Sequence, residues 1–204
     1  MVRQIYDVWS SWIRKYLLCP RCFYDELKGN ITEQELIKLK NLEYMKNLLV
    51  EYKKTEISLY RPDEKIYERK KFRNPDLGIT ARPTFTILKE HSNKKILVPY
   101  RIVFSEEKMN EAFRLQLVAD ALAIIGSKNI RQKYNIQSLE DMYGCILYVD
   151  GQEKSVNFNE NDKEKVEQVC KEIKKIITYT KNLKHSDQCP KNDDLHFLWY
   201  FDSD

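Results

Sequence analysis

The pattern of apolar positions begins with two helical stretches. In the first, apolar residues recur at helical spacing from Asp7, the expected N-cap, until Pro20 ends the run. The second opens with the capping-box pair Thr32 and Glu35 and reaches about Lys53. Each stretch predicts an amphipathic helix. The residues of the second helix that we expect to face the core are Leu36, Leu39, Leu42, Tyr44, Met45 and Leu49.

The middle of the chain alternates apolar and polar residues in short runs, which predicts strands. Residues 79–88 form one expected strand and residues 96–104 the next, with a hairpin connection at 91–93. A later hairpin has Asp150 and Gly151 at its turn. This dipeptide favours a type I′ turn, because both central residues take positive φ.

Two further helices complete the pattern. Ser105 caps a stretch so broadly apolar that its helix must be nearly buried, and the last helix runs from about Asn161 to Tyr179. A chain of 204 residues suits one well-packed unit, so we predict a single α/β domain. Its expected parts are a helical N-terminal part (1–56), a sheet core (57–158) with the buried helix 105–126, and a C-terminal helix with a cysteine-containing tail (159–204).

The charge of the chain permits a nucleic-acid partner without specifying one. The formal net charge is +4, from 35 Lys and Arg against 31 Asp and Glu. No stretch approaches the roughly 20 apolar residues that cross a bilayer. The start of the chain also lacks the apolar run and cleavage site of a secretory signal. We therefore expect a cytoplasmic protein with no membrane partner, and we leave its oligomeric state open.

Two motifs carry a resemblance to a known family. Residues 16–24 read Tyr-Leu-Leu-Cys-Pro-Arg-Cys-Phe-Tyr, and residues 113–117 read Phe-Arg-Leu-Gln-Leu. In their setting of helices and hairpins, these motifs resemble the iron-sulfur RecB-like exonucleases of the fourth CRISPR-associated protein family, over nearly the whole chain. The resemblance implies a restriction-endonuclease-type fold, with a mixed central sheet flanked by helices and both chain ends joined at a cysteine-bound metal site. It also places Gln116 at the active site.

The residues that would hold the catalytic metal differ from those of the family. Its members cut DNA with a divalent cation held by an Asp on one strand and a Glu-x-Lys on the next, since hard cations need anionic oxygen ligands. Here Thr84 stands at the Asp, Pro99 at the Glu and Arg101 at the Lys, and Asp120 stands where a tyrosine is common. The resemblance therefore implies a degenerate pocket of Thr84, Arg101 and Gln116 that does not bind the cation as the family does.

The remaining side chains in this region are positively charged. Arg82, Arg101 and Arg114 would suit phosphate binding without cleavage if they converge on one pocket. An alternative interpretation leaves Arg82 and Arg101 on the solvated face of an edge hairpin, because charged side chains are usually exposed. Gln116 can equally be an ordinary hydrogen-bonded core residue.

A rival signature would keep the protein an active nuclease dependent on Mg²⁺ or Mn²⁺. Pro75-Asp76 followed by Glu106-Glu107-Lys108 spells the Pro-Asp and Glu-x-Lys elements in order. Local structure explains both parts without catalysis. Ser105 and the acids after it favour a helix N-terminus, and Asp76 is typical of a turn.

The cysteines depart from the family as well. Cys19 matches the family's first cluster ligand and Cys189 its second, but Asn192 stands where the next is expected. Cys22 and His185 can complete a different set, Cys19-x2-Cys22 with His185-x3-Cys189, once the resemblance brings the chain ends together. Three thiolates and an imidazole suit tetrahedral zinc. A [4Fe-4S] cluster with one non-cysteine ligand, or buried thiols without metal, are the alternatives.

Three functions follow from this resemblance and its departures. The first is a nuclease-deficient protein of CRISPR adaptation, cellular or viral, that binds DNA or docks on the spacer-integration machinery. The second is an active exonuclease with displaced ligands. The third is a protein-interaction decoy of viral origin, for which the aromatic end at 197–201 is a possible docking patch.

Overall fold

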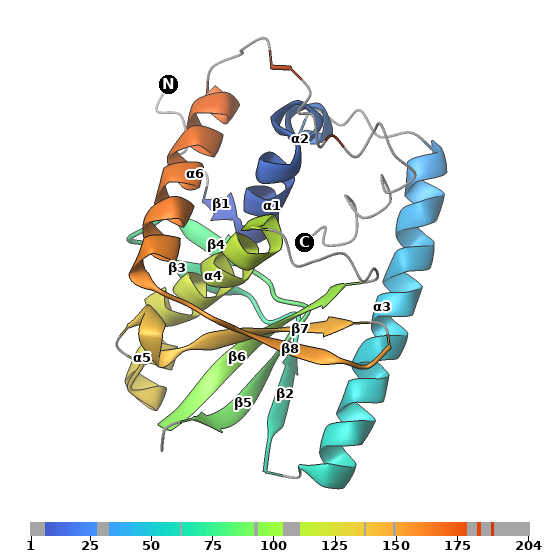
Figure 1. Cartoon of the computed structure of the whole chain (residues 1–204), viewed down its shortest axis with the longest axis vertical. Helices are drawn as coiled ribbons and strands as arrows, with labels where there is room; N and C mark the ends of the chain where they lie inside the picture. The colour runs from blue at the N-terminus through green and yellow to red at the C-terminus, as the bar shows by residue number, and fades with distance from the viewer. Residues whose placement is uncertain are drawn as a thin grey trace.

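The described part of the chain is a mixed α/β structure. This computed structural model describes residues 7–27, 33–61, 63–91, 94–103, 111–136, 138–148, 150–178, 183–184 and 189, with the backbone alone at 33–43 and 60. Two mixed sheets are flanked by helices, which confirms the predicted α/β class (Figure 1). None of the described helices is both long enough and apolar enough to span a bilayer.

The larger sheet has five strands in the order β2-β5-β6-β7-β8. The strands are β2 (Lys65–Glu68), β5 (Phe85–His91), β6 (Lys94–Val103), β7 (Tyr143–Tyr148) and β8 (Glu153–Asn157). β6 and β7 are parallel, and the other neighbours are antiparallel. A smaller sheet has the order β1-β4-β3, formed by Val8–Trp9, Ile79–Ala81 and Phe72–Asn74. The single strand predicted at 79–88 is thus two strands, because Pro83 lacks the N–H that a continuous ladder needs.

Six α-helices pack around the sheets within the described residues. They are α1 (Ser10–Leu18), α2 (Pro20–Leu27), α3 (Glu33–Tyr60), α4 (Glu111–Gly126), α5 (Lys128–Tyr134) and α6 (Glu160–Thr178), with a 3₁₀ turn at Leu139–Asp141. In the view of Figure 1, α1, α4 and α6 lie together above the five-stranded sheet, and α3 runs along its right-hand side. Nearly every residue of α4 from Ala112 to Ile124 is buried, which confirms the predicted buried helix.

The N-terminal helix ends before Pro20 as predicted, but its start differs from the prediction. Residues 8 and 9 form β1, parallel to β4, so the helix begins at Ser10 and Asp7 is not its N-cap. Asp7 instead accepts hydrogen bonds from Arg73 and from Thr80. Pro20 begins a second helix, since the first position of a helix needs no N–H donor. This break places Cys19 between α1 and α2.

The long helix α3 extends to Tyr60, well beyond the predicted end, and its buried face matches the predicted one only in part. Leu49 packs against the core as predicted, while the side chains of Leu36, Leu39 and Leu42 lie outside the described residues. Tyr44 and Met45, which we expected in the core, are 63% and 45% exposed. Lys53 is buried instead, because Glu56 and Glu153 pair with its ammonium. A buried lysine breaks the apolar pattern from which the face was predicted.

The last hairpin turns one residue earlier than predicted. Gly151 N donates to Tyr148 O at 3.0 Å, so Gly151 closes the turn and is not one of its two central residues. Gly151 has a φ of 87°, a conformation that glycine adopts without strain, whereas Asp150 does not have the positive φ that a type I′ turn needs. The arrangement matches a three-residue hairpin loop closed by a glycine bulge rather than a type I′ turn.

Candidate metal centre and buried polar pocket

Three of the four predicted metal ligands come together at one end of the structure. The Sγ atoms of Cys19, Cys22 and Cys189 all lie within 4.8 Å of one another, and Cys22 and Cys189 are separated by 3.4 Å. All three side chains are buried. His185, the predicted fourth ligand, lies outside the described residues. The cluster brings together two parts of the chain that are 167 residues apart.

Local helix geometry sets the Cys19–Cys22 half of this cluster. Cys19 N donates to Lys15 O at the end of α1, and Cys19 O accepts from Phe23 N at the start of α2. Cys22 therefore lies on the first turn of α2, where its sulfur faces Cys19. The Phe23 ring packs against the rings of Trp12 and Tyr16, with ring centres 5.9 Å and 6.3 Å apart, and these contacts hold α2 against α1.

The chemistry of the cluster suits a soft metal ion. Burial raises the pKa of the Cys22 thiol, and hydrogen bonds with Cys189 and Cys19 raise it further. The Cys22 thiol is therefore protonated unless a cation replaces its proton. Tetrahedral zinc with Zn–S bonds of about 2.3 Å places its sulfur ligands about 3.8 Å apart, within the range of separations in this cluster. The three cysteines could thus hold a metal ion.

A second group of buried polar side chains lies between the large sheet and α4. Arg101 on β6 is 1% exposed and Asp120 on α4 is fully buried. Arg101 Nε donates to Asp120 Oδ2 and Arg101 Nη2 to Oδ1, both at 2.8 Å, so the pair is bidentate. Arg101 Nη2 also donates to Ser10 Oγ at 3.1 Å. Arg101 therefore does not lie on a solvated edge.

The two other residues of the predicted degenerate pocket lie near this ion pair. Thr84 directly precedes β5, and because Phe85 pairs with Tyr100, Thr84 lies beside Arg101. Thr84 is 2% exposed, and its Oγ1 has no hydrogen-bond partner among the described residues. Gln116 is fully buried one helical turn before Asp120, on the same face of α4. The roles of Thr84, Gln116 and Arg101 in catalysis stay predictions.

The three arginines predicted to bind phosphate have three different partners. Arg101 pairs with Asp120, and Arg114 forms a bidentate pair with Asp162 at 3.0 and 2.6 Å. The Arg82 guanidinium lies 6.0 Å from the centre of the Trp9 ring. A phosphate could reach Arg101 only by displacing Asp120, so Arg82 is the one of the three without a carboxylate partner in the described structure.

Asp162 also caps the N-terminus of α6, through a capping box with Asn159. Asn159 N donates to Asp162 Oδ2, and Asp162 N donates to Asn159 Oδ1, both at 3.0 Å. Burial raises the pKa of the Asp162 carboxyl, but the hydrogen bonds from Arg114 and the Asn159 N–H outweigh it. The pKa is therefore lowered below its ordinary value of 3.8.

The lowered pKa of Asp162 predicts a stability loss in acid. Its contribution is complete above pH 3.8 and disappears as the pH falls through the lower, folded-state pKa. We expect Asp162→Asn to lose about 1–2 kcal/mol at pH 7, and its unfolding free energy to fall less than that of the wild type below pH 4. Urea denaturation between pH 7 and pH 2 measures both effects, with the exposed Asp63→Asn as the control. Identical acid dependence in Asp162→Asn and wild type would contradict this role.

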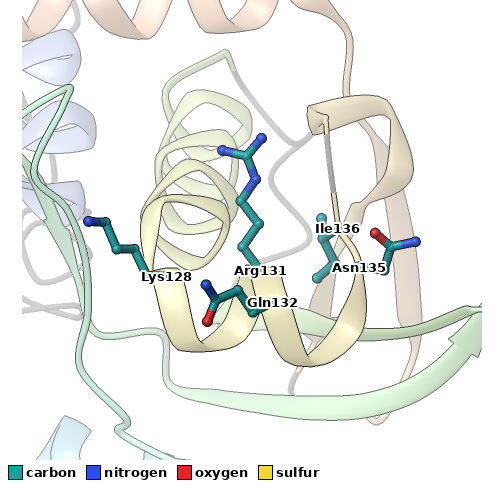
Figure 2. A pocket seen from close by; sticks show the side chains of 5 residues that line it. All are labelled: Lys128, Arg131, Gln132, Asn135 and Ile136. Carbon is teal, nitrogen blue, oxygen red and sulfur yellow. The ribbon is translucent and has the colours of Figure 1, made fainter.

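The rival nuclease signature is described only in part. Asp76 is exposed in the turn after β3 and lines a surface hollow with Arg131 and Glu160. Its predicted partners at 106–108 lie outside the described residues. An adjoining pocket on α5 has a volume of about 490 Å³. Figure 2 shows the side chains that line it, which are Lys128, Arg131, Gln132, Asn135 and Ile136. This lining contains no carboxylate.

From the sequence, Asp120 was interpreted only as a replacement for the tyrosine that is common in the family, and Ser10 was not predicted to belong to any site. One signal was available, since Asp120 is the one acid between Phe113 and Ile125 of an otherwise apolar helix. A carboxylate at such a position needs a buried cation. Which cation it would be depends on the packing of β6 against α4, which local sequence does not specify.

The comparisons with known proteins give matches to solved structures alone, to 13 chains. No protein-family model matches the chain, and no curated protein matches it. One of these structures, "Crystal structure of SSO0001", has a TM-score of 0.49 and 10% sequence identity, and the match covers 90% of this chain and 81% of that chain.

Proposed function

We propose that this protein is a nuclease-like domain that binds nucleic acid without cleaving it. The observation that supports this proposal is the buried Arg101–Asp120 pair, at the position where the resemblance expects the catalytic cation. Both carboxylate oxygens of Asp120 accept hydrogen bonds from Arg101. Both oxygens of Asp120 are thus engaged and are not available to ligate Mg²⁺, and Thr84 and Pro99 supply no anionic oxygen in their place.

The distribution of metal-ligating residues agrees with this proposal. Among the described residues, the cysteine cluster is the one group of three or more potential ligands close enough to share an ion. Sulfur ligands select zinc or iron rather than the hard cations that assist phosphodiester hydrolysis. The metal centre is therefore a structural element in this proposal, and it joins the N-terminal helices to the C-terminal segment.

A degradation and binding experiment tests the proposed function. Fluorescent single-stranded and duplex DNA would be incubated with the protein in Mg²⁺, Mn²⁺ or chelator, and binding would be followed by anisotropy at several salt concentrations. We expect no cleavage in any condition and affinity that falls steeply with salt. Metal-dependent cleavage that disappears in Asp76→Ala and Glu106→Ala would instead support the active exonuclease with displaced ligands.

Zinc is the metal that the cysteine geometry supports best. Thiolates around one ion converge on it, whereas those of a [4Fe-4S] cluster bind separate iron atoms and are further apart. Sulfur separations of at most 4.8 Å suit a single ion. Elemental analysis of anaerobically purified protein should find zinc and little iron. A brown protein with visible iron-sulfur absorption would favour the cluster.

The exposed face of α3 favours a second candidate function, docking on a protein partner. Met45, Leu48, Tyr52 and Leu59 are between 45% and 67% exposed and follow one side of the helix. Exposed apolar patches of this kind often mark interaction sites. A decoy or a docking protein would show little salt-dependent affinity for DNA, so the anisotropy experiment separates it from the nucleic-acid-binding function.

A further inference from the structure

A surface of cations and half-buried aromatic rings borders the buried polar pocket. We call it the Trp9 surface and define it by residues Trp9, Tyr67, Lys70, Lys71 and Arg82. The Lys71 ammonium lies 5.1 Å from the centre of the Trp9 ring and the Arg82 guanidinium 6.0 Å from it. The Lys70 ammonium lies 5.0 Å from the centre of the Tyr67 ring. Trp9 and Tyr67 are both partly exposed.

The cations of this surface have no acidic partner among the residues that the structure describes. Within the described part of the chain, no carboxylate pairs with Lys70, Lys71 or Arg82, whereas Arg73 nearby is paired with Asp7. Arg82 also has a buried Nε that has no hydrogen-bond partner there. Arg82 as a whole is partly exposed, and a guanidinium without a carboxylate partner suits a phosphate oxygen.

The surface is directly connected to the polar pocket through the chain. Trp9 precedes Ser10, whose hydroxyl accepts a hydrogen bond from Arg101, and Arg82 is two residues before Thr84. A ligand on the Trp9 surface would therefore lie close to the buried polar pocket. It would not need to displace Asp120 from Arg101.

We propose that the Trp9 surface binds a single strand of nucleic acid, with a base stacked on Trp9 and adjacent phosphates held by Lys71 and Arg82. This inference rests on the proposed nucleic-acid-binding function and names the surface that performs it. An unpaired base offers its face to an aromatic ring, while a base inside a duplex is already stacked. The surface should therefore prefer single-stranded over duplex nucleic acid of the same length.

Fluorescence anisotropy with a labelled oligothymidine and a duplex of equal length tests this surface. We expect Trp9→Ala to weaken single-strand binding about tenfold, and Trp9→Phe to retain most of it, because phenylalanine still stacks. Lys71→Ala/Arg82→Ala should lower the slope of log affinity against log salt by about 1.4. The control Lys171→Ala/Lys175→Ala removes the same charge from the exposed face of α6 and should leave the affinity within about twofold.

The outcomes separate this inference from the proposed function. If the wild type binds single strands but Trp9→Ala and Lys71→Ala/Arg82→Ala bind as tightly as the wild type, the Trp9 surface is not the site and the proposed function stands. If the wild type binds no nucleic acid, both fail. If Trp9→Ala unfolds, the Lys71→Ala/Arg82→Ala variant tests the surface instead. Binding of the oligothymidine should also quench the tryptophan fluorescence of the wild type, and this quenching should be lost in Trp9→Phe.

Discussion

Removing one charge of the buried Arg101–Asp120 pair is expected to lower the free energy of unfolding by about 3–5 kcal/mol. In Asp120→Asn, the Arg101 guanidinium stays buried but loses the carboxylate that pairs with two of its nitrogens. In Arg101→Met, the Asp120 carboxylate is left in the same condition. Urea denaturation followed by circular dichroism measures both losses.

The double variant separates the net contribution of the ion pair to the free energy of unfolding from the destabilisation caused by leaving one charge buried alone. Arg101→Met/Asp120→Leu removes both charges, so it should recover most of the stability that either single variant loses. The matched control is Arg114→Met, whose pair with Asp162 is partly exposed and should contribute about 1 kcal/mol. If Asp120→Asn were no more destabilising than Arg114→Met, the pair would not hold β6 to α4 as described.

Loss of any one of the three clustered cysteines is expected to release the metal and lower the thermal stability markedly. Cys19→Ser, Cys22→Ser and Cys189→Ser each leave two thiols, and the bound zinc should fall from about one ion per chain to near zero. A ligand present at 1,000 times its dissociation constant stabilises a protein by about 4 kcal/mol. We expect the variants to lose at least that amount, as measured by elemental analysis and thermal unfolding.

Two other buried cysteines provide matched controls for the metal centre. Cys145 and Cys170 are 1% and 4% exposed and belong to no described metal-ligand cluster. Serine at either position should leave the zinc content unchanged. The same assay on His185→Ala tests the fourth ligand predicted from the sequence. Retention of full zinc in Cys22→Ser would exclude the cluster as the metal centre.

The cysteine cluster shows what the sequence could predict. The Cys19-x2-Cys22 spacing lies within one local turn, so the pattern itself identified a pair of sulfur ligands. Cys189 was assigned through the resemblance alone, because no local pattern links residues 167 positions apart. The distance between the sulfurs then depended on how α2 packs against α1.

The buried face of α3 and the partner of Asp120 show what the sequence could not predict. Both depend on charged side chains in the interior, and a pattern built on hydrophobicity places such residues at the surface. Lys53 is buried because Glu153 arrives from β8. Asp120 is buried because Arg101 arrives from β6. Each partner comes from a distant part of the chain.

The span of the cysteine cluster has a consequence for biosynthesis. Cys19 and Cys22 leave the ribosome early, but Cys189 follows only after 167 more residues, roughly 10–30 s later at ordinary rates of translation. During that interval, the two early sulfurs have no third partner and are open to oxidation or to capture of a stray ion. If the cluster holds zinc as proposed, metal insertion would therefore be a late maturation event, and nascent chains truncated before residue 189 should not retain the ion.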